Sequence, residues 1–300
     1  MTWHGILAGV TTPFDLDGKF DSVGHRRNIE HMIQGGVHGL IALAVMGEGP
    51  SLSRAEAVEV AAATVEVVSG RVPVLGSVGG PNERLTTQLI ADLEDVGVDG
   101  LMVIPPWFYP LTRDELVAHL CRISARTSLP LMFYNSTYSN VPLVAETLER
   151  LVGEVPNFVA LKEGNQLQAS EVIRRFGERL AVFTARDIYI QELIAVGGAG
   201  ATSFTATLVP EFVVSLYDAA KGGDWATARH LQDQLNPLTW LLVKRSFPAA
   251  IKAALDLLSL AGGAPRPPLM PFSDADLPAL RSALQTLGAF STSRAVGLPV

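Results

Sequence analysis

The chain contains 300 residues, of which 48% are hydrophobic and 18% are charged, and its formal net charge is −7. This length accommodates one large α/β domain, and the negative charge disfavours a nucleic-acid partner. The single cysteine excludes an intrachain disulfide, and the lack of a long apolar run or a basic leader segment predicts a cytoplasmic protein with no membrane partner.

Eight short apolar segments alternate with helical segments along the chain. Several are apolar on both faces, as strands of a parallel sheet covered by helices should be. Consecutive segments begin roughly 20 to 33 residues apart, which suits one strand, one helix and two loops. The predicted strands are Ile6–Thr12, Gly39–Ala44, Val72–Val78, Gly100–Pro105, Leu129–Asn135, Phe158–Glu163, Leu180–Ala185 and Gly200–Ala206.

Helix signals lie between these segments. The run Ser53–Glu56 has the form of a capping box, and Thr112–Glu115 has the same form. Glycines at Gly35–Gly36, Gly97 and Gly197–Gly198 end helices before the next strand. Eight strand–helix units in succession favour an α/β fold whose strands close into a (β/α)8 TIM barrel, rather than an open doubly wound sheet.

After Ala206 the pattern contains helices alone. The first of them completes the eighth unit, and the others form a C-terminal helical appendage that we expect to be structural or interfacial. The chain therefore divides into a barrel over residues 1–222, which carries the active site, and a helical region over residues 223–300 packed on it. Breaks between helices are expected at Gly222–Gly223, near Arg245–Pro248 and at Gly262–Pro271, and the tail Ser291–Val300 is expected to be weakly ordered.

Lys162 stands where chemistry is expected, because the active site of such barrels lies at the C-terminal ends of the strands. It directly follows the apolar run Phe158–Leu161 of the sixth strand. Loss of hydration at the barrel mouth disfavours the ammonium form, and a neutral amine can attack a ketone to form an imine. The alternative is a lysine that reaches solvent or pairs with Glu163.

Tyr134 ends the neighbouring fifth strand, so its phenol could reach an imine on Lys162. A phenol is a suitable proton shuttle for the formation of a carbinolamine and for the cleavage of a carbon–carbon bond. The alternative is a packing residue whose hydroxyl is satisfied elsewhere.

Metal and phosphate chemistry are disfavoured. None of the histidines falls at a predicted strand end, and no two lie at the spacing of metal ligands. The glycine-rich Gly197–Gly200 precedes a strand instead of opening a helix, so it indicates a helix stop and not a phosphate or flavin site. The six histidines are His4, His25, His31, His38, His119 and His230.

Several motifs lie at the spacing of one enzyme family. The segment Gly9–Gly18 is similar to that family's first strand and turn, and Gly36–Leu40 and Gly47–Glu48 follow. The pairs Tyr134–Asn135 and Lys162–Glu163 on consecutive strands are the specific part of the match. On these residues the chain resembles, over nearly its whole length, the dihydrodipicolinate synthase and N-acetylneuraminate lyase family of Schiff-base 2-oxo acid aldolases.

The resemblance implies that Lys162 forms a Schiff base with a small 2-oxo acid such as pyruvate, and that Tyr134 is the general acid/base. It also implies a homo-oligomer, a tetramer or a dimer, and no cofactor. The family holds the carboxylate of pyruvate in a Gly-Thr-Thr-Gly-Glu turn. The corresponding segment here is Ala44-Val45-Met46-Gly47-Glu48, with Val45 and Met46 in place of the two threonines. Both hydroxyls are missing, although the N–H groups of Val45 and Met46 can still bind a carboxylate.

Two further positions depart from dihydrodipicolinate synthase. Trp107 stands where that enzyme has a second tyrosine of its proton relay, and an indole cannot accept a proton. Ser139 stands where it has an arginine that binds the second substrate. Thr11 and Thr202, in the first and eighth strands, are further candidates for substrate binding.

Arg186 and Asp187 follow the seventh strand, where sialic-acid-type lyases contact the far end of the substrate. Arginine binds a carboxylate with two parallel hydrogen bonds, so Arg186 indicates a substrate with a second acidic group. The alternative is that Arg186 pairs with Asp187 or with a neighbouring subunit.

We therefore expect a lyase, either an aldolase or a dehydratase, that acts on a 2-oxo acid and is not an authentic dihydrodipicolinate synthase. One alternative is a barrel that binds a 2-oxo acid in a regulatory role with weakened catalysis, because Val45 and Trp107 break the usual relay. Another is a divergent dihydrodipicolinate synthase. Retention of both Lys162 and Tyr134 favours the enzyme.

Overall fold

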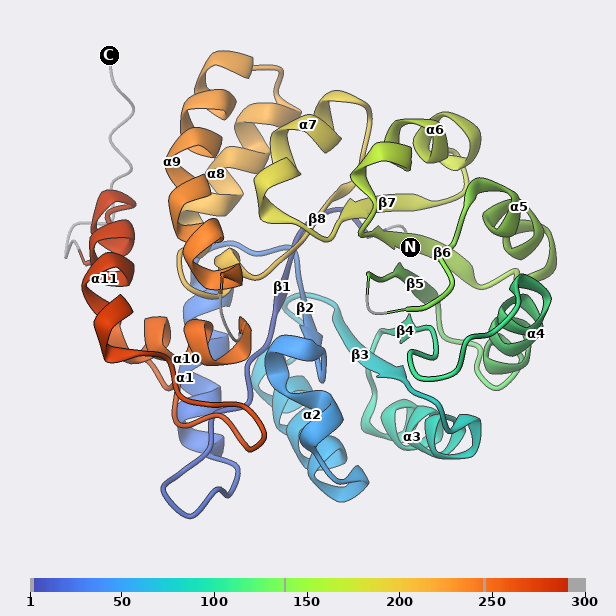
Figure 1. The fold of residues 1–300 in the computed structure, drawn as a ribbon, viewed down its shortest axis with the longest axis horizontal. Helices are drawn as coiled ribbons and strands as arrows, with labels where there is room; N and C mark the ends of the chain where they lie inside the picture. Colours follow the sequence, from blue (N-terminus) through green and yellow to red (C-terminus); the bar gives the residue numbers. More distant parts are fainter. Residues whose placement is uncertain (1–2, 138, 245–246, 291–300) are drawn as a thin grey trace.

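The computed structural model describes residues 3–137, 139–244 and 247–290. Eight parallel strands close into a barrel in sequence order, with helices around it (Figure 1). The predicted TIM barrel is therefore confirmed. The strands are β1 (Gly5–Gly9), β2 (Gly39–Ala42), β3 (Val74–Gly79), β4 (Gly100–Ile104), β5 (Leu131–Asn135), β6 (Phe158–Glu163), β7 (Ala181–Thr184) and β8 (Gly200–Ser203).

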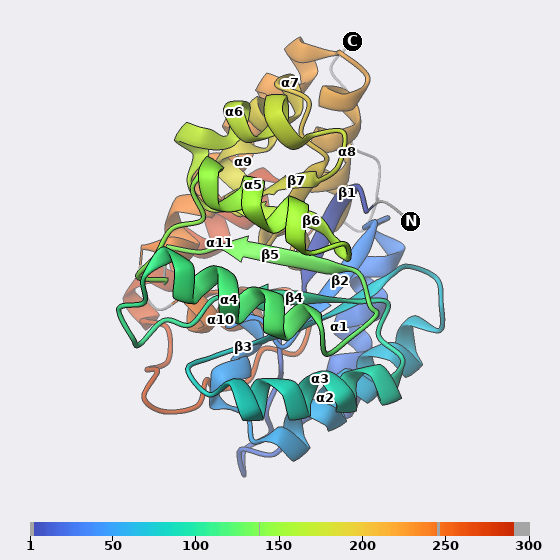
Figure 2. The same ribbon diagram turned by 90° about the vertical axis from the view of Figure 1, so that its right-hand side faces the viewer.

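Helices cover the outside of the barrel, as the side view shows for α4 and α5 (Figure 2). Both predicted capping boxes are present, at Ser53 with Glu56 and at Thr112 with Glu115. The barrel helices are α1 (Ser22–Gln34), α2 (Arg54–Val68), α3 (Glu83–Val96), α4 (Arg113–Ser124), α5 (Ala145–Glu154), α6 (Gln166–Phe176), α7 (Ile190–Ala195) and α8 (Pro210–Lys221).

Several strands are shorter than predicted from the sequence. β3 and β5 begin only after Pro73 and Pro130, because proline lacks the N–H that a strand uses for pairing. β2 ends before Leu43, whose φ of 63° turns the chain into the short 3-10 helix η1 (Val45–Gly47). After β8 the chain likewise enters η4 (Thr205–Thr207). The ends of these strands are thus continued by tight turns, which line the barrel mouth.

Side chains of the strands alternate between two apolar cores. One core lies between the barrel and its helices and includes Ile6 and Leu161. The other fills the barrel interior and includes Leu7 and Ala160. Lys162 comes two residues after Ala160, so it faces the barrel interior, above a layer of apolar side chains.

Three further helices lie on one side of the barrel, near α8 and α1 (Figure 1). They are α9 (Trp225–Val243), α10 (Phe247–Leu257) and α11 (Leu277–Thr286), with η5 (Asp274–Asp276) before the last. α9 packs along α8 and contacts η3 (Asp187–Tyr189), and α10 contacts η1. These contacts bring the C-terminal helices to the mouth of the barrel.

The predicted boundary between residues 222 and 223 falls between α8 and α9, and the division into two regions stays a prediction. Residues 245–246 of the expected helix break and the tail 291–300 lie outside the described residues. No helix in the described part of the chain is long and apolar enough to cross a membrane.

Candidate active site

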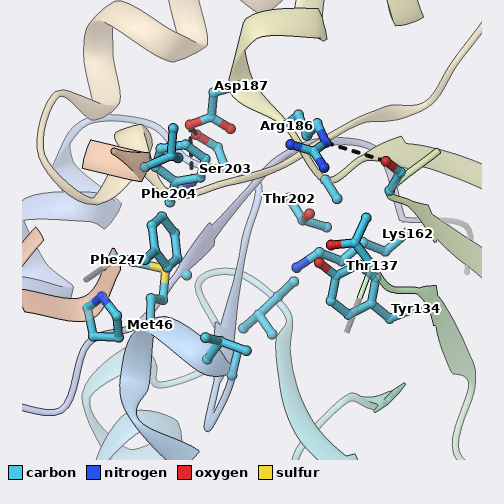
Figure 3. A pocket seen from close by; sticks show the side chains of 18 of the residues that line it. Met46, Tyr134, Thr137, Lys162, Arg186, Asp187, Thr202, Ser203, Phe204 and Phe247 are labelled. Atoms are coloured by element: carbon cyan, nitrogen blue, oxygen red, sulfur yellow. Dashed lines mark hydrogen bonds between the residues drawn. The ribbon is translucent and has the colours of Figure 1, made fainter. Parts of the chain in front are cut away.

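A cavity of about 620 Å³ lies at the C-terminal ends of the strands (Figure 3). This is the end at which barrels of this type carry their active sites. Its floor is apolar and includes Leu7, Ile41 and Met102 from the barrel interior. Lys162 and Tyr134 line the same cavity, so the two predicted catalytic side chains are brought together.

Lys162 and Tyr134 are neighbours because they face each other in the register of β5 and β6. The Nζ atom of Lys162 lies 4.2 Å from the centre of the Tyr134 ring. Burial inside the barrel lowers the pKa of Lys162 to about 8, although the carboxylate of Asp187 opposes this shift. At pH 7 roughly a tenth of the amine is therefore neutral and able to attack a carbonyl, far more than for a lysine of ordinary pKa.

Glu163 lies on the opposite side of β6 from Lys162 and is buried. Its carboxylate accepts hydrogen bonds from the side-chain amides of Asn135 (2.8 Å) and Gln168 (2.8 Å), and from the backbone N–H of Asn165. Among the described residues, Lys162 and Glu163 form no ion pair, so this alternative for the lysine is not supported. Burial raises the pKa of Glu163 to about 7, against these hydrogen bonds.

The turn after β2 lines the cavity with Val45 and Met46. This turn lies so close to β1 that side chains would collide there. A Cβ on Gly47 would lie 2.6 Å from the carbonyl oxygen of Val10, and a Cβ on Gly9 would lie 2.0 Å from the Met46 sulfur. Glycine at both positions therefore permits this packing. The first N–H groups of such a turn have no partner within it, so they are free to bind an anion.

Glu48 also lines the cavity, and its partner lies too far along the chain to be recognised from the sequence. It forms a buried ion pair with Lys252 of α10, with 2.5 Å between Oε1 and Nζ, and its Oε2 accepts the backbone N–H of Arg266. Lys252 in turn donates to the carbonyl of Ala264. The turn after β2 is thereby fixed to the C-terminal region.

Asp187 has different surroundings from those that the sequence suggested. It lines the cavity but is fully buried, and its Oδ2 accepts hydrogen bonds from Ser203, Phe204 and Thr205. Burial raises the pKa of Asp187, while the hydrogen bonds from Thr205 and Ser203 oppose the shift. Asp187 therefore fixes the turn after β8, and a direct contact with substrate stays a prediction.

Arg186 lines the cavity without a carboxylate partner among the described residues. Its Nε donates to the carbonyl of Gly164 at 3.4 Å, and Figure 3 shows its guanidinium above Thr202, away from the Asp187 carboxylate. Pairing of Arg186 with Asp187 is therefore not supported within the chain. Binding of an anionic substrate group by this guanidinium stays a prediction.

The other predicted binding residues divide into two groups. Thr202 lines the cavity, with its hydroxyl donated to the carbonyl of Thr184 at 3.2 Å. Thr11, Trp107 and Ser139 are not among the described residues that line it. Thr11 is buried, the carbonyl of Trp107 accepts from Asn140, and Ser139 donates to the carbonyl of Val141 within its own loop.

The structure adds lining residues that sequence reasoning missed. Side chains from α9 and α10 reach the cavity, so the C-terminal helices are more than the structural or interfacial appendage expected. No local motif indicates this, because it depends on packing between distant parts of the chain. The added residues include Thr137, Phe204, Thr239, Trp240, Val243 and Phe247.

Residues 2–287 match the model of the dihydrodipicolinate synthetase family. A 4-hydroxy-tetrahydrodipicolinate synthase of Nitratidesulfovibrio vulgaris is 33% identical over 291 residues, covering 96% of this chain and 99% of the relative.

Solved structures give the same assignment. The dihydrodipicolinate synthase of Thermotoga maritima superposes with a TM-score of 0.92 at 27% identity, covering 97% of this chain and 100% of that one. YagE, a prophage protein of this family from E. coli K12 solved in complex with pyruvate, superposes with a TM-score of 0.92 at 26% identity, covering 96% and 100%. The chain belongs to the dihydrodipicolinate synthetase family of lyases.

Proposed function

We propose that this protein is a lyase in which Lys162 forms a Schiff base with the C2 carbonyl of a 2-oxo acid such as pyruvate. The observation that carries the proposal is the position of Lys162, whose Nζ lies in the cavity 4.2 Å from the Tyr134 ring. Burial lowers its pKa to about 8. The pyruvate complex of YagE, a structural relative, supports a 2-oxo acid as substrate.

The reaction follows from these two residues. The Lys162 amine adds to the C2 carbonyl, and loss of one water gives a protonated imine. Removal of a proton from C3 then gives an enamine, whose C3 attacks an aldehyde carbonyl, while the aldehyde oxygen takes a proton delivered by Tyr134. Water hydrolyses the new imine, and the product leaves with Lys162 restored. In a dehydratase, the enamine expels a hydroxyl as water instead.

The carboxylate of the 2-oxo acid fits the turn formed by Val45 and Met46. The N–H groups of this turn supply the hydrogen bonds, since neither side chain carries a hydroxyl. Arg186 would hold a second anionic group, because its guanidinium reaches the cavity without a carboxylate partner among the described residues.

The proposal excludes efficient synthesis of 4-hydroxy-tetrahydrodipicolinate. Ser139 occupies the place of the arginine that would bind aspartate semialdehyde, and the hydroxyl groups of the usual relay are absent at Val45 and Trp107. Purified protein given pyruvate and aspartate semialdehyde should form little condensation product. Rapid condensation would show instead a divergent enzyme of the lysine pathway.

Exchange of hydrogen at C3 tests the lysine mechanism without knowledge of the acceptor. Incubation of pyruvate with the protein in D2O should replace methyl hydrogens by deuterium, because the enamine forms reversibly. Proton NMR measures the loss of the methyl signal. The variant Lys162→Ala should show only the uncatalysed rate, and equal exchange by the variant would refute the mechanism.

A further inference from the structure

The cavity has two chemically different walls (Figure 3). Lys162, Tyr134 and Arg186 lie together on one side. Met46, Phe204 and Phe247 gather on the other side, across the cavity from the lysine. A substrate that fills the whole space must therefore be polar at one end and apolar at the other.

The apolar wall is assembled from distant segments. Phe204, just after β8, and Phe247, at the start of α10, form an edge-to-face pair with 4.9 Å between ring centroids. Met46 is buried next to β1. Trp240 and Val243 of α9 also line the cavity, and both are partly exposed.

The two carboxylates near this wall are bound mainly by other groups within the described part of the chain. The carboxylate of Glu48 is bound by Lys252 and by the N–H of Arg266. Asp187 is fully buried, and its Oδ2 accepts hydrogen bonds from the turn after β8, while its Oδ1 has no hydrogen-bond partner among the described residues. A polar or charged group placed against the rings of Phe204 and Phe247 would lose hydration without gaining a hydrogen bond from them. The wall thus selects against an acceptor such as aspartate semialdehyde.

The rim of the wall remains open. Trp240 and Val243 keep 58% and 43% of their surface exposed, so two large apolar side chains that line the cavity remain in contact with water. The cavity volume of about 620 Å³ falls within the roughly 300–1,000 Å³ of sites that hold drug-sized ligands, far more than a three-carbon acid needs. Space and apolar surface therefore both remain once the 2-oxo acid is bound at Lys162.

We infer that the acceptor of the reaction is an apolar aldehyde, with an aryl or branched alkyl group that packs on Met46, Phe204, Phe247 and Trp240. The inference rests on the proposed lysine mechanism and deepens it by naming the class of the second substrate. The new carbon–carbon bond joins C3 of the enamine to the aldehyde carbon, and the apolar group takes no part in the chemistry. In the reverse direction, the protein would cleave a 4-hydroxy-2-oxo acid with an apolar group on C4.

The test compares benzaldehyde with glyceraldehyde as acceptors of pyruvate, with the condensation products measured by mass spectrometry. The purified full chain should give the higher kcat/KM with benzaldehyde. Trp240→Ala and Phe247→Ala should each lower this value about tenfold, the factor expected for loss of roughly 50–60 Å² of apolar contact. Neither variant should lower kcat/KM with glyceraldehyde by a similar factor.

Trp225→Ala is the matched control. Trp225 starts the same helix, is 45% exposed, and does not line the cavity, so this variant should behave as the unchanged protein. Because Trp240 is largely exposed, Trp240→Ala should fold even if Phe247→Ala does not. Deuterium exchange of pyruvate should persist in all three variants.

The possible results distinguish a failure of the apolar-acceptor inference from a failure of the Lys162 mechanism. Exchange without any preference for benzaldehyde would overturn the inference alone, whereas absence of exchange in the unchanged protein would overturn the mechanism. If a second copy of the chain covers Trp240, Trp240→Ala would change the oligomeric state and leave the benzaldehyde reaction intact. That result would also contradict the inference.

Discussion

The positions of Lys162 and Tyr134 in the parallel sheet determine which side chain each one meets and how far each is removed from water. Each lies near the end of its strand, and the register of β5 and β6 places them opposite each other. The barrel interior removes water from the amine and lowers its pKa, which an exposed lysine would not experience. This pairing could be predicted from the sequence because adjacent strands of such a barrel end at the same edge.

Tyr134→Phe tests the role of the phenol. The variant keeps the ring beside Lys162 and removes the exchangeable proton, so turnover should fall about 10²-fold or more. Steady-state kinetics with pyruvate and the preferred acceptor measure the effect. Turnover near that of the unchanged protein would mean that water or another side chain carries the proton.

Arg186→Ala tests recognition of a second acidic group. Loss of a hydrogen bond to a charged group costs about 1.5–3 kcal/mol, so kcat/KM should fall for 2-oxo acids that carry a second carboxylate. 2-Oxoglutarate and 2-oxopentanoate form a matched pair for this measurement, with deuterium exchange at C3 as the readout. Arg186→Lys keeps the charge and should retain part of the preference for the diacid, and an equal loss for both 2-oxo acids would make Arg186 a structural residue.

At the scale of elements, the ends of β5 and β6 are joined by a buried network. Glu163 accepts from Asn135 of β5 and from Gln168 of α6, on the side of the sheet opposite to Lys162. The two strands that carry the proposed catalytic pair, Lys162 and Tyr134, are thereby held together by groups on the side of the sheet away from the cavity. Glu163 is a positioning residue in this account.

Glu163 should also give the protein a measurable dependence of stability on pH. Its folded pKa of about 7 lies above its ordinary value of 4.5, so the folded state binds a proton more tightly than the unfolded state. Stability should therefore fall as pH rises from about 4.5 to 7, by up to about 1.4 kcal/mol per pH unit.

The comparison with Glu163→Gln isolates this contribution. The side-chain amide of the variant does not titrate, so the difference between the two unfolding free energies should change over this pH range. Urea unfolding at about pH 5, 6 and 7 measures it for both proteins. A difference that stays constant with pH would contradict the raised pKa.

Helices and strands differ in how far they could be predicted from the sequence. The capping boxes at Ser53 and Thr112 form as predicted, because the motif is local and satisfies its own hydrogen bonds. The ends of strands are predicted less accurately from the sequence, since the turn at Leu43 depends on close packing of η1 against β1. The contribution of α9 and α10 to the cavity could not be predicted, because it arises from tertiary contacts alone.

For the whole molecule, one buried ion pair joins the barrel to the C-terminal helices. Lys252 and Glu48 have almost no exposure, and Lys252 also lies 4.2 Å above the Phe14 ring. Removal of one partner leaves an uncompensated buried charge. Lys252→Met should therefore lower the free energy of unfolding by about 3–5 kcal/mol.

The double variant Glu48→Leu with Lys252→Met supplies the control. It removes both charges, so it should recover part of the lost stability, and urea unfolding of the unchanged protein, the two single variants and the double variant measures the coupling. A loss below about 1 kcal/mol in Lys252→Met would show that the ion pair does not stabilise the junction. A homo-oligomer, tetramer or dimer, stays a prediction at this scale.

The central claim is that Lys162 is the residue that binds the 2-oxo acid covalently. The most direct measurement is to incubate the protein with pyruvate and borohydride and to map the adduct by peptide mass spectrometry among the five lysines of the chain, Lys19, Lys162, Lys221, Lys244 and Lys252. We expect an adduct on Lys162, formed faster as pH rises toward about 8, and no adduct in Lys162→Ala. An adduct that persists on another lysine in that variant, or no adduct in the unchanged protein, would contradict it.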